Sequence, residues 1–414
     1  MTSGDIVRQI REVYQERPYP GSQSSIRRTG RYLPPLEWIS AISAKRGRFP
    51  KRILVAGCGT GLEALALCKR SPEAEIVGID FSPRSIHEAL ELQKRLLRRQ
   101  SIRFFVGDLT NRRFMNSLGS DFDFISCHGV ISYIPRPDRA VRNLARCLRS
   151  DGVLYLGVNG AAHFSRAWRR ALPILGFDMR QLQSTRGLRR VLRLCDAVAG
   201  FKIAQMPANY LGSDLFGPLI HNLPVSKWIH ICTDSGLHFA GDFFGYRNLR
   251  SVLNEGLLDV LFARSRAQVH QFLATVVPCG FHPLIFSMRA PQTPPWEKND
   301  LFNWRPSVTP LYRVAAVRRR RSQLRLRSQP LNMLVEVRTA GWEYELLKQS
   351  NGDRPLGEVL KKIPTGVSRE KLRKQLFLFY QLAVLNLYAS TSPLKFDYCQ
   401  EPHVLARNSD PNVL

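Results

Sequence analysis

The residues with the clearest chemical potential are three closely spaced glycines and one acid that follows them. Gly57, Gly59 and Gly61 alternate directly after the apolar run Ile53–Ala56, and Asp80 closes the next apolar run. Glycines at this spacing let the backbone approach a ligand, and a helix that begins behind them offers unpaired N–H groups. A carboxylate at the end of the second run can accept hydrogen bonds from both hydroxyls of a ribose. The pattern predicts a nucleoside-binding site.

The spacing within the glycine loop, G-C-G-T-G at residues 57–61, narrows the choice of ligand. Dinucleotide sites use G-x-G-x-x-G, whose third glycine admits a pyrophosphate, and P-loops carry a lysine that pairs with phosphate. This loop has neither the longer spacing nor the lysine. We therefore expect a compact ligand without a pyrophosphate, with its ribose over the loop.

The elements that must position this loop alternate between strands and helices. Short apolar runs separated by amphipathic stretches predict an α/β fold with a doubly wound parallel sheet. The expected strands and helices are Arg52–Ala56, Gly61–Lys69, Glu75–Ile79, Pro83–Arg98, Ile102–Val106, Phe122–His128, Asp138–Leu148 and Val153–Val158. Gly152 is expected to form a turn before the fifth strand. Two later strands, His238–Phe244 and Pro283–Met288, are expected to complete the sheet, the last pair antiparallel.

The remaining parts of the chain differ from this core in composition. Residues 1–50 contain a turn at Pro18-Tyr19-Pro20, and we expect them to form a lid over the binding edge. The alternative is that this turn only packs the N-terminal segment on the sheet. The further ranges expected are 51–160 for the core, 161–290 for helical insertions and completion of the sheet, 291–330 for a basic linker and 331–400 for a small helical or winged-helix-like domain.

Five stretches in chain order carry a family resemblance: VAGCGTG, VGIDFSP, VGDLT, DFDFISCHGVISYIP and LRSDGVLYLGV. They resemble the motifs of class I S-adenosylmethionine-dependent methyltransferases, which implies a Rossmann-like sheet and S-adenosylmethionine as the cofactor. The cofactor-binding residues that the resemblance implies are Gly57, Cys58, Gly59, Gly61, Asp80, Phe81, Asp108, Leu109 and His128. Asp80 would hold the ribose hydroxyls, and Asp108 with Leu109 would contact the adenine. A Rossmann-like module that binds another nucleotide, or that is inactive, is the alternative.

The end of the fourth strand would face the acceptor of the methyl group. Enzymes that methylate exocyclic amino groups of bases usually carry Asn/Asp-Pro-Pro-aromatic there, whereas this chain has Ser126-Cys127-His128-Gly129. RNA cytosine-C5 enzymes resemble one another in a Pro-Cys pair, and Ser126 before Cys127 disfavours a covalent cysteine mechanism. The candidate catalytic residues are His128, as a base or an orienting donor, and the aromatics Tyr133 and Tyr19. Simple packing is the alternative for each of them.

Four segments outside the core carry a second resemblance: YQERPYP, GLHFAGDFF, FHPLIFSMR and YELLKQSNGDRPLGEVL. They look like a bacterial family in which a class I domain carries a C-terminal regulatory region, and some members methylate lysines of outer-membrane proteins. This resemblance implies a protein substrate, with lysine favoured. An RNA substrate and a small-molecule or natural-product substrate remain the alternatives.

The chain is strongly basic, with 61 Lys and Arg against 33 Asp and Glu and a formal net charge of +28. Such a charge speeds association with phosphates, anionic lipid or an acidic protein, although thinly spread arginines would give the same total. Residues 313–328 concentrate seven arginines and no acid. This segment could contact nucleic acid or an acidic protein surface, or it could be a solvated linker or helix face.

Several features are expected to be absent. The eight cysteines show no C-x-x-C pair, so we expect neither a disulfide framework nor a zinc site, and a reduced, cytoplasmic setting fits best. No metal is predicted, because direct displacement at a sulfonium needs no Lewis acid. No run approaches the roughly 18 apolar residues of a membrane span, and the first residues lack the apolar core of a signal peptide.

Overall fold

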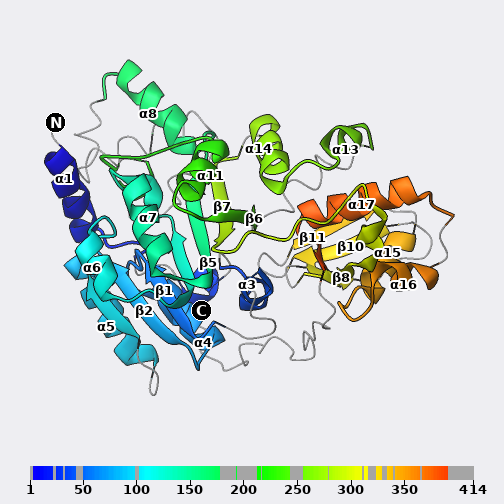
Figure 1. Ribbon diagram of the computed structural model, residues 1–414. Coiled ribbons are helices and arrows are strands. Elements are labelled where there is room, and N and C mark those ends of the chain that lie inside the picture. The colour runs from blue at the N-terminus through cyan, green and yellow to red at the C-terminus, as the bar shows by residue number, and fades with distance from the viewer. Residues whose placement is uncertain are drawn as a thin grey trace.

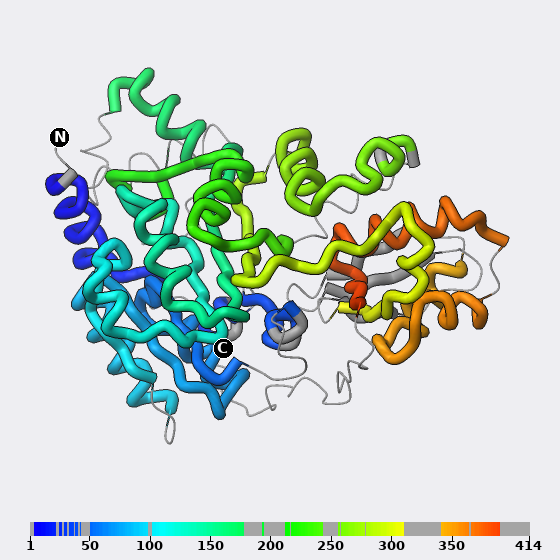
Figure 2. Tube along the Cα trace, viewed as in Figure 1, coloured from blue at the N-terminus to red at the C-terminus, as the bar shows by residue number. Residues whose placement is uncertain are grey.

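The structure is a computed structural model of the 414-residue chain. It describes residues 3–21, 25–30, 33–42, 50–97, 102–177, 193, 212–215, 217–242, 255–277, 279–309, 312–315, 323–328, 333–338, 341–363 and 366–389. The described elements form a larger lobe around a central sheet and a smaller C-terminal lobe at one end of the molecule (Figures 1 and 2).

A seven-stranded sheet forms the centre of the larger lobe, in the order β3-β2-β1-β4-β5-β7-β6. Its strands are β1 Arg52–Ala56, β2 Glu75–Asp80, β3 Arg103–Val106, β4 Phe122–His128, β5 Leu148–Asn159, β6 His238–Asp242 and β7 Phe281–Ser287. Strand β7 runs antiparallel to both β5 and β6, and the pairs from β3 to β5 are parallel. The predicted Rossmann-like class I sheet, including its antiparallel completion, is confirmed.

Helices cover both faces of this sheet (Figure 1). In chain order the helices of the larger lobe are α1 Ser3–Glu16, α2 Ile26–Gly30, α3 Leu36–Ile42, α4 Leu62–Arg70, α5 Pro83–Leu96, α6 Arg112–Ser117, α7 Pro137–Cys147, α8 Phe164–Ile174, α11 Val225–Thr233, α13 Glu255–Leu261 and α14 Arg266–Val276. Several of these helices begin at a residue whose side chain caps the helix. Before α5, for example, the Ser82 hydroxyl accepts a hydrogen bond from the backbone N–H of Ser85. Successive residues of β1 divide between two apolar cores, Leu54 in one and Ile53 and Val55 in the other, as a sheet buried on both faces requires.

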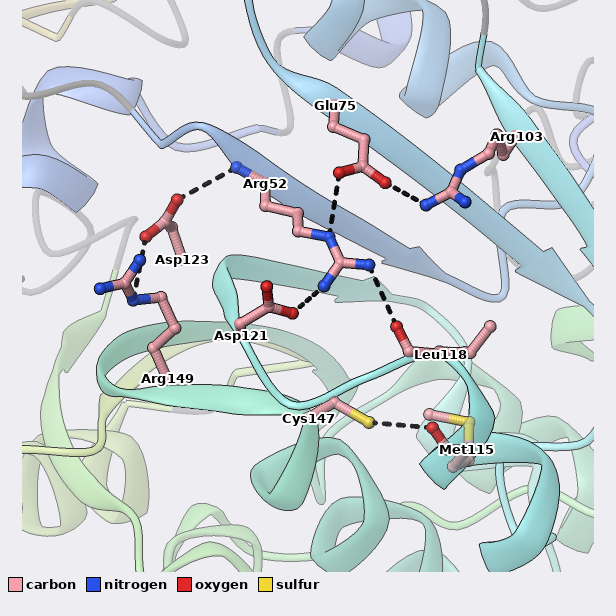
Figure 3. A network of polar contacts seen from close by, with 9 residues as sticks. All are labelled: Arg52, Glu75, Arg103, Met115, Leu118, Asp121, Asp123, Cys147 and Arg149. Carbon is pink, nitrogen blue, oxygen red and sulfur yellow. Dashed lines mark hydrogen bonds and ion pairs between the residues drawn. The ribbon is translucent and has the colours of Figure 1, made fainter.

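Ion pairs tie together the amino ends of the strands, at the edge opposite the glycine loop (Figure 3). The Arg52 guanidinium lies 3.1 Å from the Glu75 carboxylate, donates to the Leu118 carbonyl oxygen at 3.2 Å and pairs with Asp121. The backbone N–H of Arg52 donates to Asp123 at 3.0 Å. This network is structural, and it leaves the carboxyl edge of the sheet for binding.

The predicted turn at Gly152 is wrong, because Gly152 lies inside strand β5. Helix α7 ends at Cys147, and β5 begins at the next residue, where Leu148 pairs with Phe122 before the register shifts. A Cβ at Gly152 would lie 2.9 Å from the Phe122 carbonyl oxygen. The glycine therefore serves a close approach of two strands rather than a turn.

Among the described residues, the C-terminal lobe combines a short 3₁₀ helix and three α-helices with two small antiparallel sheets. Its elements are η4 Asn299–Asn303, β8 Arg305–Val308, β9 Tyr312–Ala315, β10 Gln323–Ser328, β11 Met333–Arg338, α15 Trp342–Gln349, α16 Leu356–Lys361, α17 Arg369–Gln381 and β12 Leu385–Tyr388. The winged-helix-like character and the limits of the predicted C-terminal domain stay a prediction, and strand β8 lies within the range 291–330 that was predicted as a linker. The described parts of the arginine-rich segment form β9 and β10, and Arg318–Arg321 lie outside the described residues.

Helix α17 connects the two lobes through α13 and α14. One guanidinium nitrogen of Arg266 donates to the Tyr380 carbonyl oxygen at 2.7 Å, and the guanidinium carbon lies 4.0 Å from the centre of the Tyr380 ring. The Lys374 ammonium lies 2.6 Å from the Asp259 carboxylate. Within the described part of the chain, none of the helices has the length and apolar content that crossing a membrane requires.

Candidate active site

The glycine loop joins β1 to α4 at the carboxyl edge of the sheet. Gly57, Gly59 and Gly61 have φ values of 76°, 52° and 82°, in the left-handed region that favours glycine. A Cβ at Gly57 would lie 2.3 Å from a methyl carbon of Val130, and one at Gly59 would lie 2.2 Å from the Tyr19 carbonyl oxygen. The glycines are thus required both by the turn and by close neighbours within the chain.

Asp80 ends β2 beside this loop, and its carboxylate joins two backbone segments. One oxygen accepts the N–H of Gly59 and the other accepts the N–H of Ser82, each at 2.9 Å. Burial raises the pKa of Asp80, and these backbone N–H groups oppose the rise. Each carboxylate oxygen has a second lone pair, so both can still accept a ribose hydroxyl. This geometry fits the predicted role, which stays a prediction.

The N-terminal segment lies directly against the glycine loop and Asp80. The Tyr19 carbonyl oxygen accepts the Thr60 N–H at 3.0 Å. The Tyr14 ring meets the Phe81 ring edge-on at 6.2 Å, and the Ser82 hydroxyl donates to the Tyr14 carbonyl oxygen at 3.4 Å. These contacts suit the predicted lid. They involve the backbone of Tyr19, and the predicted catalytic role of its side chain stays a prediction.

On the adenine side, the predicted contacts lie in a tightly bonded turn after β3. One Asp108 oxygen accepts the N–H of Thr110 at 2.7 Å and its hydroxyl at 2.8 Å. The Asn143 amide donates to the Leu109 carbonyl oxygen at 2.9 Å, and the Leu109 side chain is buried in an apolar core. Hydrogen bonds within the turn and from Asn143 of α7 therefore fix its conformation. Its contact with adenine stays a prediction.

His128 ends β4 as predicted, but its surroundings make it a weak base. Its Nδ1 lies 2.6 Å from the Tyr155 hydroxyl oxygen, and its ring centre lies 5.1 Å from that of Phe281. Burial lowers the pKa of His128 to about 4, so the ring is neutral at pH 7. The neighbouring Cys127 is fully buried, and burial raises the pKa of its thiol. This burial fits the prediction that Cys127 is not a nucleophile.

A buried carboxylate and two tyrosines gather near the ends of β4 and β5. The Tyr133 hydroxyl donates to the Asp214 carboxylate at 2.7 Å and accepts from the Asn159 amide at 3.1 Å. Burial raises the pKa of Tyr14, and the carboxylates of Asp214 and Asp80 raise it further. Of this group only Tyr133 was predicted as a site residue. Asn159 could have been found from its place at the end of the fifth strand.

Glu63 is a second residue that the sequence interpretation missed. It lies in the first turn of α4, directly behind the glycine loop, and accepts a hydrogen bond from the Ser126 hydroxyl of β4. Burial raises the pKa of Glu63 to about 7, and the bond from Ser126 opposes the rise. A carboxyl group beneath the cofactor loop therefore titrates close to neutral pH.

Replacing Glu63 by glutamine is expected to change how stability depends on pH. The folded protein keeps the Glu63 proton between its usual pKa of 4.5 and about 7, where the unfolded chain has lost it. Stability from this group is therefore full below pH 4.5 and is lost as the pH rises towards 7, by about 1–3 kcal/mol. Denaturant unfolding at pH 5 and pH 8 should show this loss in the wild type and not in Glu63→Gln. The exposed Glu73→Gln should behave as wild type, and an unchanged pH slope in Glu63→Gln would refute the assignment.

Comparisons with known proteins agree with this arrangement. Residues 54–154 match a family model described as a methyltransferase domain. An uncharacterised protein of Synechococcus sp. is 33% identical over 179 residues, covering 41% of this chain and 39% of that protein. A ubiquinone biosynthesis O-methyltransferase of Aeromonas salmonicida is 26% identical over 121 residues, covering 29% of this chain and 48% of that enzyme. The chain thus spans less than half the length of either relative.

Solved structures resemble this chain over most of its length, and one of them contains a bound nucleoside. The structure of PKMT2 from Rickettsia typhi in complex with AdoHcy superposes with a TM-score of 0.54 at 15% sequence identity. The match covers 87% of this chain and 76% of that chain, and at this identity it shows the fold alone. The positive-φ glycine loop and the half-buried Asp80 offer the shape and the acceptors expected at an adenosyl site. Residues 54–154 are a methyltransferase domain within a sheet of the class I fold, and the glycine loop and Asp80 of this domain suit S-adenosylmethionine as the cofactor.

Proposed function

We propose that this chain transfers the methyl group of S-adenosylmethionine to a protein side chain, with the lysine amine as the favoured acceptor. The observation that carries the proposal is the extent of the likeness to PKMT2, a protein methyltransferase, which covers 87% of this chain. The matched region therefore extends well beyond the methyltransferase domain at residues 54–154. By contrast, two relatives named as O-methyltransferases align with only 29% and 28% of the chain. The region outside the domain is the part that selects an acceptor in this proposal.

The group formed by Tyr133, Asp214 and Tyr14 suits a lysine acceptor. Methyl transfer from a sulfonium is a direct displacement, so much of the catalysis is alignment of the nucleophile with the methyl carbon. Lysine is protonated at pH 7 and must lose a proton before it attacks. A buried carboxylate attracts the ammonium and can accept that proton, while neighbouring tyrosines offer aromatic faces to the cation. We assign His128 an orienting role, because its Nδ1 is already engaged by the Tyr155 hydroxyl at 2.6 Å.

Two other acceptors define the alternatives. The relatives named as O-methyltransferases favour a small molecule, and the net charge of +28 favours RNA. The experiment that separates them uses tritiated S-adenosylmethionine and a lysate of the source cells, divided between protease, RNase and size filtration. We expect macromolecular label that protease removes and RNase leaves, with methylated lysine after acid hydrolysis. Label that RNase removes, or that passes the filter, would overturn the protein assignment.

A further inference from the structure

Three potential metal ligands converge at the far end of the sheet from β3. Asp242 ends β6, His270 lies on α14, and His282 is the second residue of β7. One ligand atom from each side chain lies within 4.8 Å of the others, and the His270 Nε2 is 3.2 Å from a carboxylate oxygen of Asp242. Because β7 runs antiparallel to β6, its first residues lie at the same edge as the last residue of β6.

This cluster is buried, and one of its nitrogens is not satisfied by the protein. His270 is 7% exposed and His282 is 2% exposed, and the Asp242 side chain is 8% exposed. The His270 Nε2 makes no hydrogen bond of acceptable geometry despite its nearness to Asp242. The Phe239 ring lies 5.4 Å from the His270 ring and restricts its access to water. A buried nitrogen that lies near a carboxylate but makes no hydrogen bond with it is incompletely satisfied, and a ligand that binds both groups would satisfy it.

The donor set identifies the kind of ligand. Two imidazole nitrogens and one carboxylate oxygen suit divalent transition metals, and Zn²⁺ sites with three protein ligands commonly have this composition. Two ligand atoms that each lie about 2.1 Å from a tetrahedral Zn²⁺ are about 3.4 Å apart, close to the separation between His270 and Asp242. We propose that Asp242, His270 and His282 bind a divalent transition-metal ion, with Zn²⁺ favoured, and that the ion ties β6, β7 and α14 together.

The cluster lies next to residues that contact His128, but it is not itself part of the methyl-transfer site. Phe281, the residue before His282, contacts the His128 ring. Burial raises the pKa of Tyr155, the hydrogen-bond partner of His128, and the carboxylates of Glu63 and Asp242 raise it further. The sequence predicted no metal because the cysteines lack ligand spacing and the displacement needs no Lewis acid. The proposed site uses no cysteine, and its role is structural, so methyl transfer still proceeds at the sulfonium alone.

The test measures metal content and thermal stability of the full chain without a histidine tag. After dialysis against a chelator, adding Zn²⁺ should restore one ion per chain, measured by mass spectrometry of the metal, and raise the melting temperature by several degrees. The variants His270→Ala and Asp242→Asn should lose both effects. His230→Ala is the matched control, because His230 also lies 3.3 Å from an aspartate, Asp234, but on the exposed surface. This control should bind Zn²⁺ as the wild type does.

A second measurement needs no variant, in case His270→Ala fails to fold. Co²⁺ bound to the chelator-treated wild type should give the visible absorption of a low-coordinate site with nitrogen and oxygen ligands, and Zn²⁺ should displace it. Binding of Mn²⁺ or Fe²⁺ in place of Zn²⁺ with the same loss in Asp242→Asn would support the site. No retained ion and no thermal shift with any of these metals would overturn it and leave a metal-free His–Asp pair. Retention of one ion by a folded His270→Ala would overturn it as well.

Discussion

Replacing Asp80 by alanine is expected to weaken the binding of S-adenosylhomocysteine by about 5- to 150-fold, which corresponds to about 1–3 kcal/mol. The substitution removes the predicted acceptor for two ribose hydroxyls, which would then be buried without a partner. It also releases the N–H groups of Gly59 and Ser82, which the carboxylate holds at 2.9 Å. Isothermal titration calorimetry of the full chain measures the affinity directly.

The control for this prediction is Asp138→Ala, which removes a partly exposed acid that pairs with Arg136 at the start of α7. It should bind S-adenosylhomocysteine as the wild type does. Circular dichroism should show that both variants are folded. Wild-type affinity in a folded Asp80→Ala would mean that the cofactor site is misplaced, whatever the acceptor is.

The parts of the fold that the sequence revealed are those with local signals. Strands β1 and β4 have the bounds that were predicted, because a buried parallel strand is a short apolar run between polar or glycine-rich turns. The glycine loop was also a local signal, because three glycines in five residues directly after an apolar run predict a turn whose backbone can approach a ligand. The local signal was misleading at β5. Gly152 is needed there because the Phe122 backbone comes close to it, and this approach exists only in the folded sheet.

The sequence of the arginine-rich region contains a strand pattern that the sequence analysis did not use. Residues 323–328 read QLRLRS, and residues 333–338 read MLVEVR, both with the two-residue alternation of a strand. The interpretation weighed the charge of residues 313–328 and expected a linker or a helix face. In the structure β10 pairs antiparallel with β9 and with β11.

The groups that the sequence could not reveal are assembled from distant segments. Asp214 reaches Tyr133 from a position 81 residues away, and Ser126 reaches Glu63 across 63 residues. The cluster of Asp242, His270 and His282 depends on the antiparallel insertion of β7 beside β6. Neither hydrophobic periodicity nor motif spacing predicts such long-range contacts. Taken alone, each of these residues looks like an ordinary polar residue in a helix, strand or loop.

Replacing Asp214 by asparagine is expected to lower kcat for the protein acceptor at pH 7 by about 10²- to 10⁴-fold, the usual contribution of a positioned proton acceptor. Asparagine keeps the shape and can still accept from the Tyr133 hydroxyl, but it neither attracts an ammonium nor takes its proton. The affinity for S-adenosylhomocysteine should change little. Tyr133→Phe, which leaves the carboxylate in place, should cost less, about tenfold. Wild-type kcat in Asp214→Asn would remove Asp214 from the acceptor site without affecting the Asp80 result.

The pH dependence distinguishes a proton acceptor from a merely structural group. Free lysine amines lose their proton near pH 10.4, so the fraction of neutral acceptor rises about tenfold per pH unit between pH 7 and pH 10. Burial, which Asp214→Asn keeps, is the main cause that raises the pKa of Tyr14 and Tyr133, so these hydroxyls stay protonated over that range and do not replace the lost base. The deficit of Asp214→Asn should therefore shrink as the pH rises, because solvent hydroxide increasingly supplies the neutral amine. A deficit that stays constant from pH 7 to pH 10 would mean that Asp214 only supports the fold around Tyr133.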